Sequence, residues 1–253
     1  MSERTAKYNS EEIAGIRRSC AAAASILQEL VAYAKPGVNP LQIDEIARAR
    51  IRDAGVEPAF LGYEHFPAVL CTSVNNIVVH GVPNEHPFRD GDLLGLDFGV
   101  VLDGWYSDVA VTIPIGRVGT ETQRLLDVTR EALDFGIAQA KPGNRVGDIS
   151  AAIQRHVEAA SFQVIRELVG HGVGRQLHEP PQIPNFGKPG TGPELTEGMV
   201  IAIEPITSLS SPHVRLAADG FSYETTDGSL AAHFEHTIVI TSRGSQILTA
   251  VDT

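Results

Sequence analysis

The chain repeats one pattern of helix, turn and helix about 106 residues apart, and this repeat restricts the folds open to it. The stretch AYAKPG at 32–37 matches AQAKPG at 138–143, and the apolar positions that follow keep the offset: Ile43, Ala47 and Ile51 match Ile149, Ile153 and Val157. Asp97 and Glu204, each next to an apolar run, are related by nearly the same offset. We therefore predict one domain over 1–253 made of two related halves, at about 10–110 and 115–240.

Each half begins with two amphipathic helices. Apolar side chains recur every three or four residues, which predicts helices over 10–34, 41–53, 120–140 and 148–160. Ser10 and Thr120 stand where a capping residue is expected, and Gln123 has the capping-box spacing from Thr120. Lys-Pro-Gly ends the first helix of each half. Strand-like runs follow both helix pairs, so the sequence indicates an α+β fold with its strands gathered in the middle.

Composition excludes several classes of protein. Of the 253 residues, 43% are hydrophobic and 20% are charged, which favours a folded core over a disordered chain. The net charge of −11 would repel a phosphate backbone, so nucleic acid is not an expected partner. Two cysteines cannot form a disulfide framework and suit a reducing compartment. No apolar run approaches the ~20 residues of a membrane helix, and the polar start lacks the apolar core of a signal peptide. We therefore expect a cytoplasmic protein.

Two aspartates interrupt apolar runs in the first half, Asp97 in LLGLDFGVVL and Asp108 in WYSDVAVTI. Asp103 and Gly104 between them are typical of a two-residue hairpin turn. With that turn the numbers of facing residues add up to 207, which places Asp97 and Asp108 on one face of the hairpin. The two carboxylates would repel each other unless a proton or a metal ion lay between them. The alternative is a solvent-exposed edge with two ordinary acids.

Further acids and histidines stand in apolar or glycine-rich surroundings. Glu204 follows the run VIAI, Glu235 lies in HFEHTIVI, and His171 lies in VGHGVGR. Buried carboxylates cost several kcal/mol unless they are compensated, and divalent cations compensate them well. A site rich in carboxylates with one histidine suits Mn, Fe, Co or Zn. His80 and His178 each lie shortly before a proline; taken singly, such a residue is more often an ordinary core or loop histidine.

These five candidate ligands resemble the two-metal set of the methionine aminopeptidases, which form the pita-bread family with the prolidases and creatinase. The segment CTSVNNIVVHGVP is similar to the type I methionine enzymes in particular. The resemblance implies a pseudo-two-fold α+β fold in which a central antiparallel β-sheet has helices packed on its outer face. It rests on stretches at 60–83, 96–112, 170–187, 199–205 and 233–241, in the order of the family.

The resemblance also implies how the ligands share two divalent ions, which could be Co, Mn, Fe(II) or Zn. Asp97 would bind one ion, Asp108 and Glu235 would bridge both, and His171 and Glu204 would complete the other. Ions held this way lower the pKa of a water, and the resulting hydroxide would hydrolyse the first peptide bond. Glu204 would carry the proton from that water to the leaving amine.

Two more histidines and an apolar pocket complete the site that the resemblance implies. His178 would stabilise the oxyanion and His80 would hold the peptide backbone, so both join Glu204 as candidate catalytic residues. The side chain of the substrate would contact Tyr63, Phe66, Cys71 and Phe221. Leu177 and Phe221 depart from the common pattern, in which an aromatic residue and Trp are frequent, so the shape of the pocket stays open.

The expected activity is removal of the N-terminal methionine from peptides and nascent proteins, including chains at the ribosome, by a monomeric enzyme. The nearest alternative is an Xaa-Pro aminopeptidase or dipeptidase of the same fold. Those enzymes usually carry an extra N-terminal domain, whereas only about 60 residues precede LGYEHFP here. A non-catalytic peptide-binding relative would have lost some of the five ligands. A redox enzyme is disfavoured because the candidate ligand set contains no cysteine.

Overall fold

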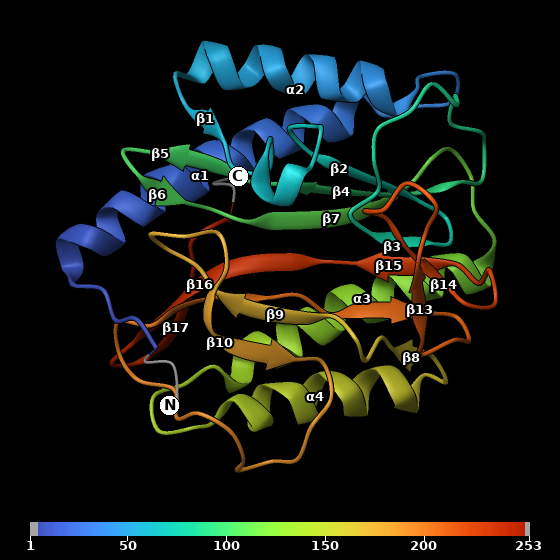
Figure 1. The fold of residues 1–253 in the computed structure, drawn as a ribbon. Coiled ribbons are helices and arrows are strands. Elements are labelled where there is room, and N and C mark those ends of the chain that lie inside the picture. Colours follow the sequence, from blue (N-terminus) through green and yellow to red (C-terminus); the bar gives the residue numbers. More distant parts are fainter. Residues whose placement is uncertain (1–4, 251–253) are drawn as a thin grey trace.

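The computed structural model describes residues 5–250. Within them the chain forms four α-helices that pack against strands in the middle (Figure 1). The helices occur in two consecutive pairs, and every boundary lies within two residues of the predicted one. The first half contributes α1 and α2, and the second contributes α3 and α4. Their bounds are Ser10–Tyr33, Pro40–Ala54, Thr120–Gln139 and Val146–Ala159.

The predicted caps of α1 and α3 are wrong by one residue. Asn9 caps α1, because its side chain accepts hydrogen bonds from the backbone of the first turn, and Ser10 is already helical. Asparagine and serine cap helices about equally well, so the sequence alone did not separate them. At α3 the cap is Gly119, without a side-chain hydrogen bond; Thr120 begins the helix, and the predicted capping box with Gln123 does not form.

An eight-stranded antiparallel sheet forms the centre of the molecule. Its strands run in the order β10-β9-β11-β16-β7-β4-β2, and β17 pairs with β16. The strands β2, β4 and β7 lie side by side, and β16 connects them to β11, β9 and β10 (Figure 1). In chain order the bounds are β2 Cys71–Val74, β4 Leu93–Phe98, β7 Val109–Pro114, β9 Val169–Gly172, β10 Glu179–Pro184, β11 Val200–Ile203, β16 Glu235–Thr241 and β17 Gly244–Ile247.

Three small sheets extend this centre, and a short 3-10 turn, η1 (Tyr63–His65), follows β1. The small sheets have the strand orders β1-β5-β6, β15-β12-β8 and β13-β14-β3. Their bounds are β1 Glu57–Pro58, β3 Ile77–Val79, β5 Val100–Leu102, β6 Trp105–Tyr106, β8 Gln163–Val164, β12 Ile206–Ser208, β13 Val214–Leu216, β14 Tyr223–Thr225 and β15 Ala231–His233.

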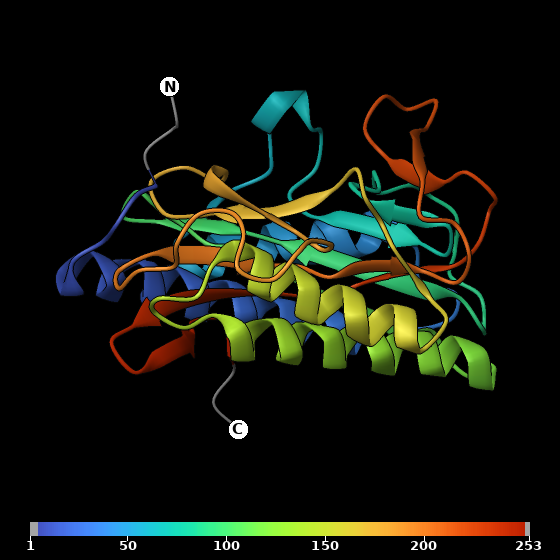
Figure 2. The same cartoon turned by 90° about the horizontal axis from the view of Figure 1, so that it is seen from below.

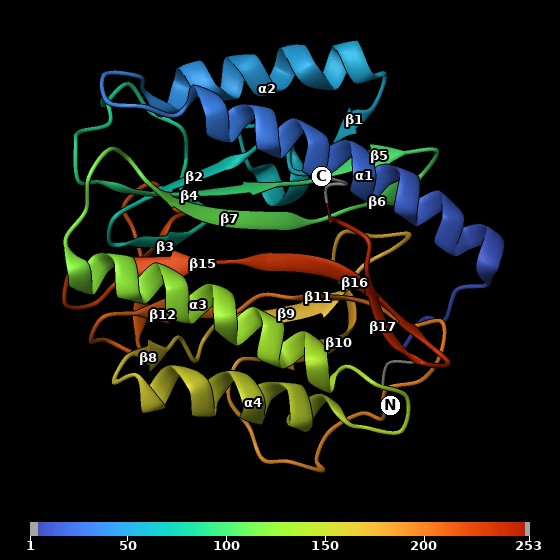
Figure 3. The same ribbon diagram turned by 180° about the vertical axis from the view of Figure 1, so that it is seen from behind.

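All four helices cover one face of the sheet, as the view from behind shows (Figure 3). The turn η1 and the hairpin of β13 and β14 rise on the opposite face (Figure 2). Apolar side chains fill the space between helices and sheet: Leu30 of α1 and Ile43 of α2 join one core cluster, and Leu125 of α3 and Ile149 of α4 join another. The predicted α+β class, with an antiparallel sheet and helices on its outer face, is confirmed.

The register predicted for the hairpin in the first half is confirmed. Pairs from Leu93↔Pro114 to Phe98↔Val109, and again Leu102↔Trp105, have numbers that add up to 207. Asp103 and Gly104 both have positive φ, of 53° and 75°, as a type I′ turn requires. The division into two related halves stays a prediction. Within residues 5–250, no helix is apolar and long enough to span a bilayer.

Candidate metal centre

The three carboxylates nearest the centre of the sheet share one face of it. Asp97 of β4 has Cys71 of β2 on one side and Ala110 of β7 on the other. Ala110 in turn pairs with Glu235, the first residue of β16. Side chains directly across a sheet point to the same face, so Asp97 and Glu235 face each other over a methyl group. Asp108, two residues before Ala110, shares this face.

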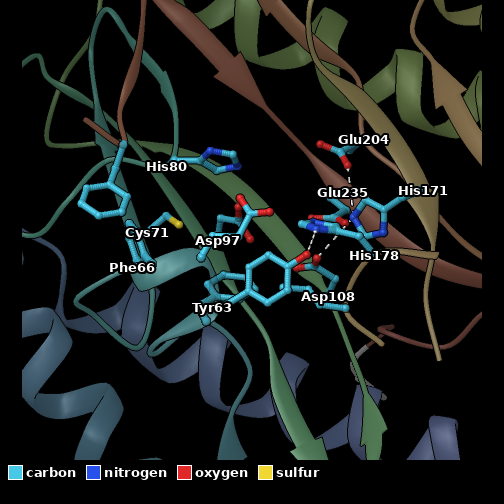
Figure 4. Close-up of a pocket in the computed structure, with 14 residues that line it drawn as sticks. Tyr63, Phe66, Cys71, His80, Asp97, Asp108, His171, His178, Glu204 and Glu235 are labelled. Carbon is cyan, nitrogen blue, oxygen red and sulfur yellow. Dashed lines mark hydrogen bonds and ion pairs between the residues drawn. The ribbon is translucent and has the colours of Figure 1, made fainter. Parts of the chain in front are cut away.

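The second half adds Glu204, directly after β11, and His171 of β9. The His171 Nε2 atom lies 3.5 Å from Asp108 Oδ2 and 3.5 Å from Glu204 Oε1. Donor atoms of His171, Glu204 and Glu235 lie within 4.8 Å of one another, as do those of Asp97, Asp108 and Glu235. The fold therefore brings all five predicted ligands together (Figure 4).

Hydrogen bonds orient these side chains and their backbone. The Nδ1 atom of His171 lies 2.9 Å from the carbonyl of Gly172. A carbonyl only accepts, so Nδ1 carries a proton, and Nε2 is the ring nitrogen that faces the carboxylates. Thr237 Oγ1 donates to the backbone carbonyl of Asp108 at 2.7 Å, and Asn185 Nδ2 donates to that of Glu204 at 2.9 Å. These contacts fix the backbone just before β7, at Asp108, and just after β11, at Glu204.

The electrostatics of the cluster fit a divalent cation. Burial raises the pKa of Asp97 and of Glu235 well above the ordinary range, and the Asp108 carboxylate raises both further. One oxygen each of Asp97, Asp108 and Glu235 is buried without a hydrogen-bond partner. Buried carboxylate oxygens without donors are costly, and hard or borderline cations satisfy them. The donor set of four carboxylates and one imidazole nitrogen matches such ions.

An apolar pocket opens beside the carboxylates. The predicted pocket residues Tyr63, Phe66, Cys71 and Phe221 all line it, together with Leu177 and the five ligands. The Phe66 and Phe221 rings pack edge to face with centroids 5.7 Å apart. Figure 4 shows Phe66 and Cys71 on the side of Asp97 that lies away from His171. The pocket therefore joins an apolar wall to a charged floor.

Both predicted catalytic histidines line the same pocket. His178 Nδ1 lies 2.8 Å from the hydroxyl of Tyr63, and its ring packs edge-on against His171. Desolvation lowers the pKa of His178, and it also lowers the pKa of His80, so both rings are neutral near neutral pH. His80 has a positive φ of 56°, a strained conformation for a residue with a Cβ atom.

Sequence reasoning missed one residue, His233. It is 4% exposed, and its Nε2 atom lies 3.4 Å from Glu204 Oε2 without forming a hydrogen bond. Thr112 Oγ1 holds its backbone, accepting from the N–H and donating to the carbonyl at 2.8 Å. Its position two residues before Glu235 was a weak signal, because β15 ends at His233 and β16 begins only at Glu235. His233 leaves Glu204 between two imidazole rings, those of His171 and His233.

The chain is similar to known proteins over most of its length. Methionine aminopeptidase 1 of Bacillus subtilis is 46% identical to it over 88% of this chain and 90% of its own length. The crystal structure of methionine aminopeptidase from Thermotoga maritima superposes with a TM-score of 0.96, at 43% identity, over 97% of this chain and 99% of that chain. The prolidase of Pyrococcus furiosus, at 22% identity and a TM-score of 0.78, covers 98% of this chain and 66% of its own and shares the fold.

These likenesses confirm the predicted pita-bread fold and the family resemblance. The sequence model of metallopeptidase family M24 matches residues 14–242, a range that contains all five candidate ligands and both candidate catalytic histidines. The match covers most of the sequence. The chain belongs to metallopeptidase family M24.

Proposed function

We propose that this chain is a metal-dependent methionine aminopeptidase that removes the N-terminal methionine from peptides and nascent proteins. The observation that carries the proposal is the placement of the five candidate ligands on the floor of a narrow apolar pocket. A metal site at the end of an apolar pocket suits hydrolysis next to an unbranched apolar side chain. The near-full-length likeness to methionine aminopeptidases supports the same substrate.

The metal part of the proposal assigns the ligands to two divalent ions. Asp97 would hold one ion, His171 and Glu204 would hold the other, and Asp108 and Glu235 would be shared by both. The grouping of donor atoms supports this division, because Glu235 belongs both to the group with Asp97 and to the group with His171. The chemistry available from bound divalent ions is Lewis acidity, which polarises a carbonyl and lowers the pKa of water. Mn, Fe(II), Co and Zn all accept these donors.

The chain's own residues then move protons and stabilise charge. Glu204 accepts the proton of the attacking water and returns it to the leaving amine. Because the Tyr63 hydroxyl contacts Nδ1 of His178, a neutral His178 ring with its proton on Nε2 can donate to the developing oxyanion. His80, on the other side of the pocket, holds the backbone of the second substrate residue. A single-ion mechanism with Glu204 as the base would use the same residues.

The pocket wall selects the first side chain. Phe66, Phe221 and Leu177 supply flat and branched apolar surfaces, and Cys71 supplies a small polarisable one. An unbranched thioether adapts to such surfaces and makes favourable contacts with aromatic rings. We further propose that the enzyme acts as a monomer in the cytoplasm, where it meets nascent chains at the ribosome.

Peptidase assays on chelator-stripped protein test the proposal. Met-Ala-Ser peptides should release free methionine only after Mn, Co, Fe(II) or Zn is returned. Asp108→Ala should abolish activity and weaken metal binding. His178→Ala should lower kcat by about 100-fold while metal content stays intact. His86→Ala, at an exposed histidine, is the matched control and should behave as wild type.

Three outcomes would contradict the proposal. Cleavage confined to Ala-Pro peptides would make the chain an Xaa-Pro peptidase. Full activity in the Asp108 variant would remove that residue from the metal centre. Loss of metal from the His178 variant would turn the proposed oxyanion donor into a ligand.

A further inference from the structure

The residue next to His178, Glu179, ties the proposed oxyanion donor to the N-terminal segment of the chain. The Tyr8 hydroxyl donates to Glu179 Oε2 at 2.7 Å, across 171 residues of sequence. We propose that Tyr8 is a positioning residue that holds the loop 173–179, called here the His178 loop, in its working place through Glu179. The inference rests on the role proposed above for His178.

Glu179 first folds the His178 loop onto itself. Its Oε1 atom accepts the backbone N–H groups of Arg175 at 2.8 Å and Gln176 at 2.9 Å. The N–H of Gly174 also bonds to the carbonyl of Gln176 at 3.1 Å. One carboxylate oxygen therefore closes the loop, and the other is left for Tyr8. Hydrogen bonds to a charged acceptor are stronger than neutral ones, which suits a contact that must hold position.

Tyr8 is itself held firmly. Its side chain is 9% exposed, its ring packs edge-on against Trp105 with centroids 5.5 Å apart, and its backbone N–H donates to Gly198 at 2.8 Å. Gly174 lies directly against the ring, so close that a Cβ atom there would be 2.2 Å from the Tyr8 hydroxyl oxygen. Tyr8 therefore contacts both the backbone of the His178 loop, at Gly174, and a side chain of the loop, that of Glu179.

The charge of Glu179 and the protonation of Tyr8 both favour a hydrogen bond in which Tyr8 donates and Glu179 accepts. Burial raises the pKa of Tyr8, and the Glu179 carboxylate raises it further, so the phenol keeps its proton and donates it. The Arg175 backbone N–H, 3.2 Å from the Tyr8 oxygen, can use the same hydroxyl as an acceptor. The Arg175 guanidinium lies 3.4 Å from the centroid of the Trp105 ring, the ring that also packs against Tyr8.

The contact between His178 and Tyr63 is less rigidly supported. Tyr63 is 36% exposed, and the two residues after it, Glu64 and His65, have positive φ values of 45° and 71°. Non-glycine residues in that region are strained, so this turn is a weak anchor for a catalytic group. The placement of His178 therefore depends on its own loop, and that loop depends on Tyr8.

Tyr8→Phe removes only the hydroxyl, and Tyr33→Phe, at a tyrosine 43% exposed on the far end of α1, is the matched control. We expect kcat to fall about tenfold in Tyr8→Phe, because misplacing a catalytic group by 1 Å can cost roughly 100-fold. The KM and the Mn affinity should change less than about twofold, since the hydroxyl contacts neither the ligands nor the apolar pocket. In a His178→Ala background, Tyr8→Phe should lower kcat no further, because the group it positions is gone.

Hydrogen exchange gives a readout that does not depend on the reaction. The backbone N–H groups of Arg175 and Gln176 should exchange faster in Tyr8→Phe than in wild type or Tyr33→Phe. Unchanged exchange would overturn the tether itself. Faster exchange with an unchanged kcat, or an equal loss of kcat with and without His178, would overturn the positioning role. If wild type cut no methionyl peptide, the proposed function would fail while the exchange result still judged the tether.

Discussion

Replacing Glu235 by glutamine should stabilise the metal-free protein and destroy its response to metal. Glu235 is 2% exposed, and one of its oxygens has no hydrogen-bond partner. Its donor atom lies within 4.8 Å of those of Asp97 and Asp108. At an effective dielectric constant of about 20, two unit charges at that distance repel by about 3.5 kcal/mol, so two ionised neighbours would oppose ionisation by about 7 kcal/mol. Glutamine keeps the shape and removes the charge.

The protein avoids the full repulsion by taking up a proton, which limits the gain. Protonating a carboxyl with an ordinary pKa of 4.5 at about pH 7.5 costs about 4 kcal/mol. Glu235→Gln should therefore raise the free energy of unfolding of the chelated protein by 2 to 4 kcal/mol (about 5–15 °C in Tm) at about pH 7.5. At about pH 5 the same reasoning leaves less than about 1 kcal/mol.

The dependence on pH has a definite sign. Because the folded-state pKa of Glu235 is raised, its favourable contribution is complete below its unfolded pKa and is lost as pH rises toward the folded value. Chelated wild type should lose stability between about pH 5 and pH 7.5, and Glu235→Gln should lose less. Saturating Mn should cancel or reverse this order, since a ligand at 1,000 times its Kd stabilises wild type by about 4.1 kcal/mol.

Urea unfolding in EDTA and in Mn, at both pH values, measures these differences. Glu45→Gln, at an exposed acid of α2, is the matched control and should change neither curve. The reasoning is refuted if the chelated Glu235→Gln protein is less stable than wild type at about pH 7.5. It is also refuted if Mn stabilises the variant as much as wild type.

Three further changes test the scaffold and the pocket. In thermal melts, Gly99→Ala should lower the free energy of unfolding by about 1–3 kcal/mol, because its Cβ would lie 2.5 Å from a backbone carbonyl oxygen. Gly119→Ala is the control and should be tolerated, because the space around Gly119 is open. Thr237→Val leaves the backbone carbonyl of Asp108 without its donor, so titration should show weaker Mn binding, and unfolding should cost about 1–3 kcal/mol less. Phe221→Ala opens the pocket wall and should raise KM for methionyl peptides about tenfold in steady-state assays; an unchanged KM would remove Phe221 from the pocket.

The sequence predicted the parts of the site that depend on local chain geometry. A two-residue turn at Asp103 fixes every facing pair in the hairpin, so the common face of Asp97 and Asp108 followed from counting alone. Helix positions were equally accessible, because the period of apolar residues is a local property. The meeting of Glu204 with Glu235 needed more, namely the pairing of β11 with β16, and here the family resemblance supplied what periodicity did not.

Residues whose roles depend on distant contacts were not predictable. His233 belongs to β15, and the chain breaks its strand pattern at Phe234 before β16 begins, so simple alternation gave no firm orientation. Tyr8 precedes the first helix and carries no motif; only the folded chain brings it to Glu179. The error at the start of α1 has a different cause, since asparagine and serine are about equally favoured as helix caps.

The order in which the carboxylates meet has a consequence for folding kinetics. Asp97 and Asp108 belong to one local hairpin, which closes early because its loop is short. The third carboxylate, Glu235, arrives only when β16 docks beside β7, a pairing of residues far apart in sequence. Like charge therefore opposes closure of the hairpin, and it opposes the later docking of β16 more strongly, because the third carboxylate then meets two others. A divalent ion bound at the hairpin would offset that repulsion, so refolding from denaturant should be faster in its presence.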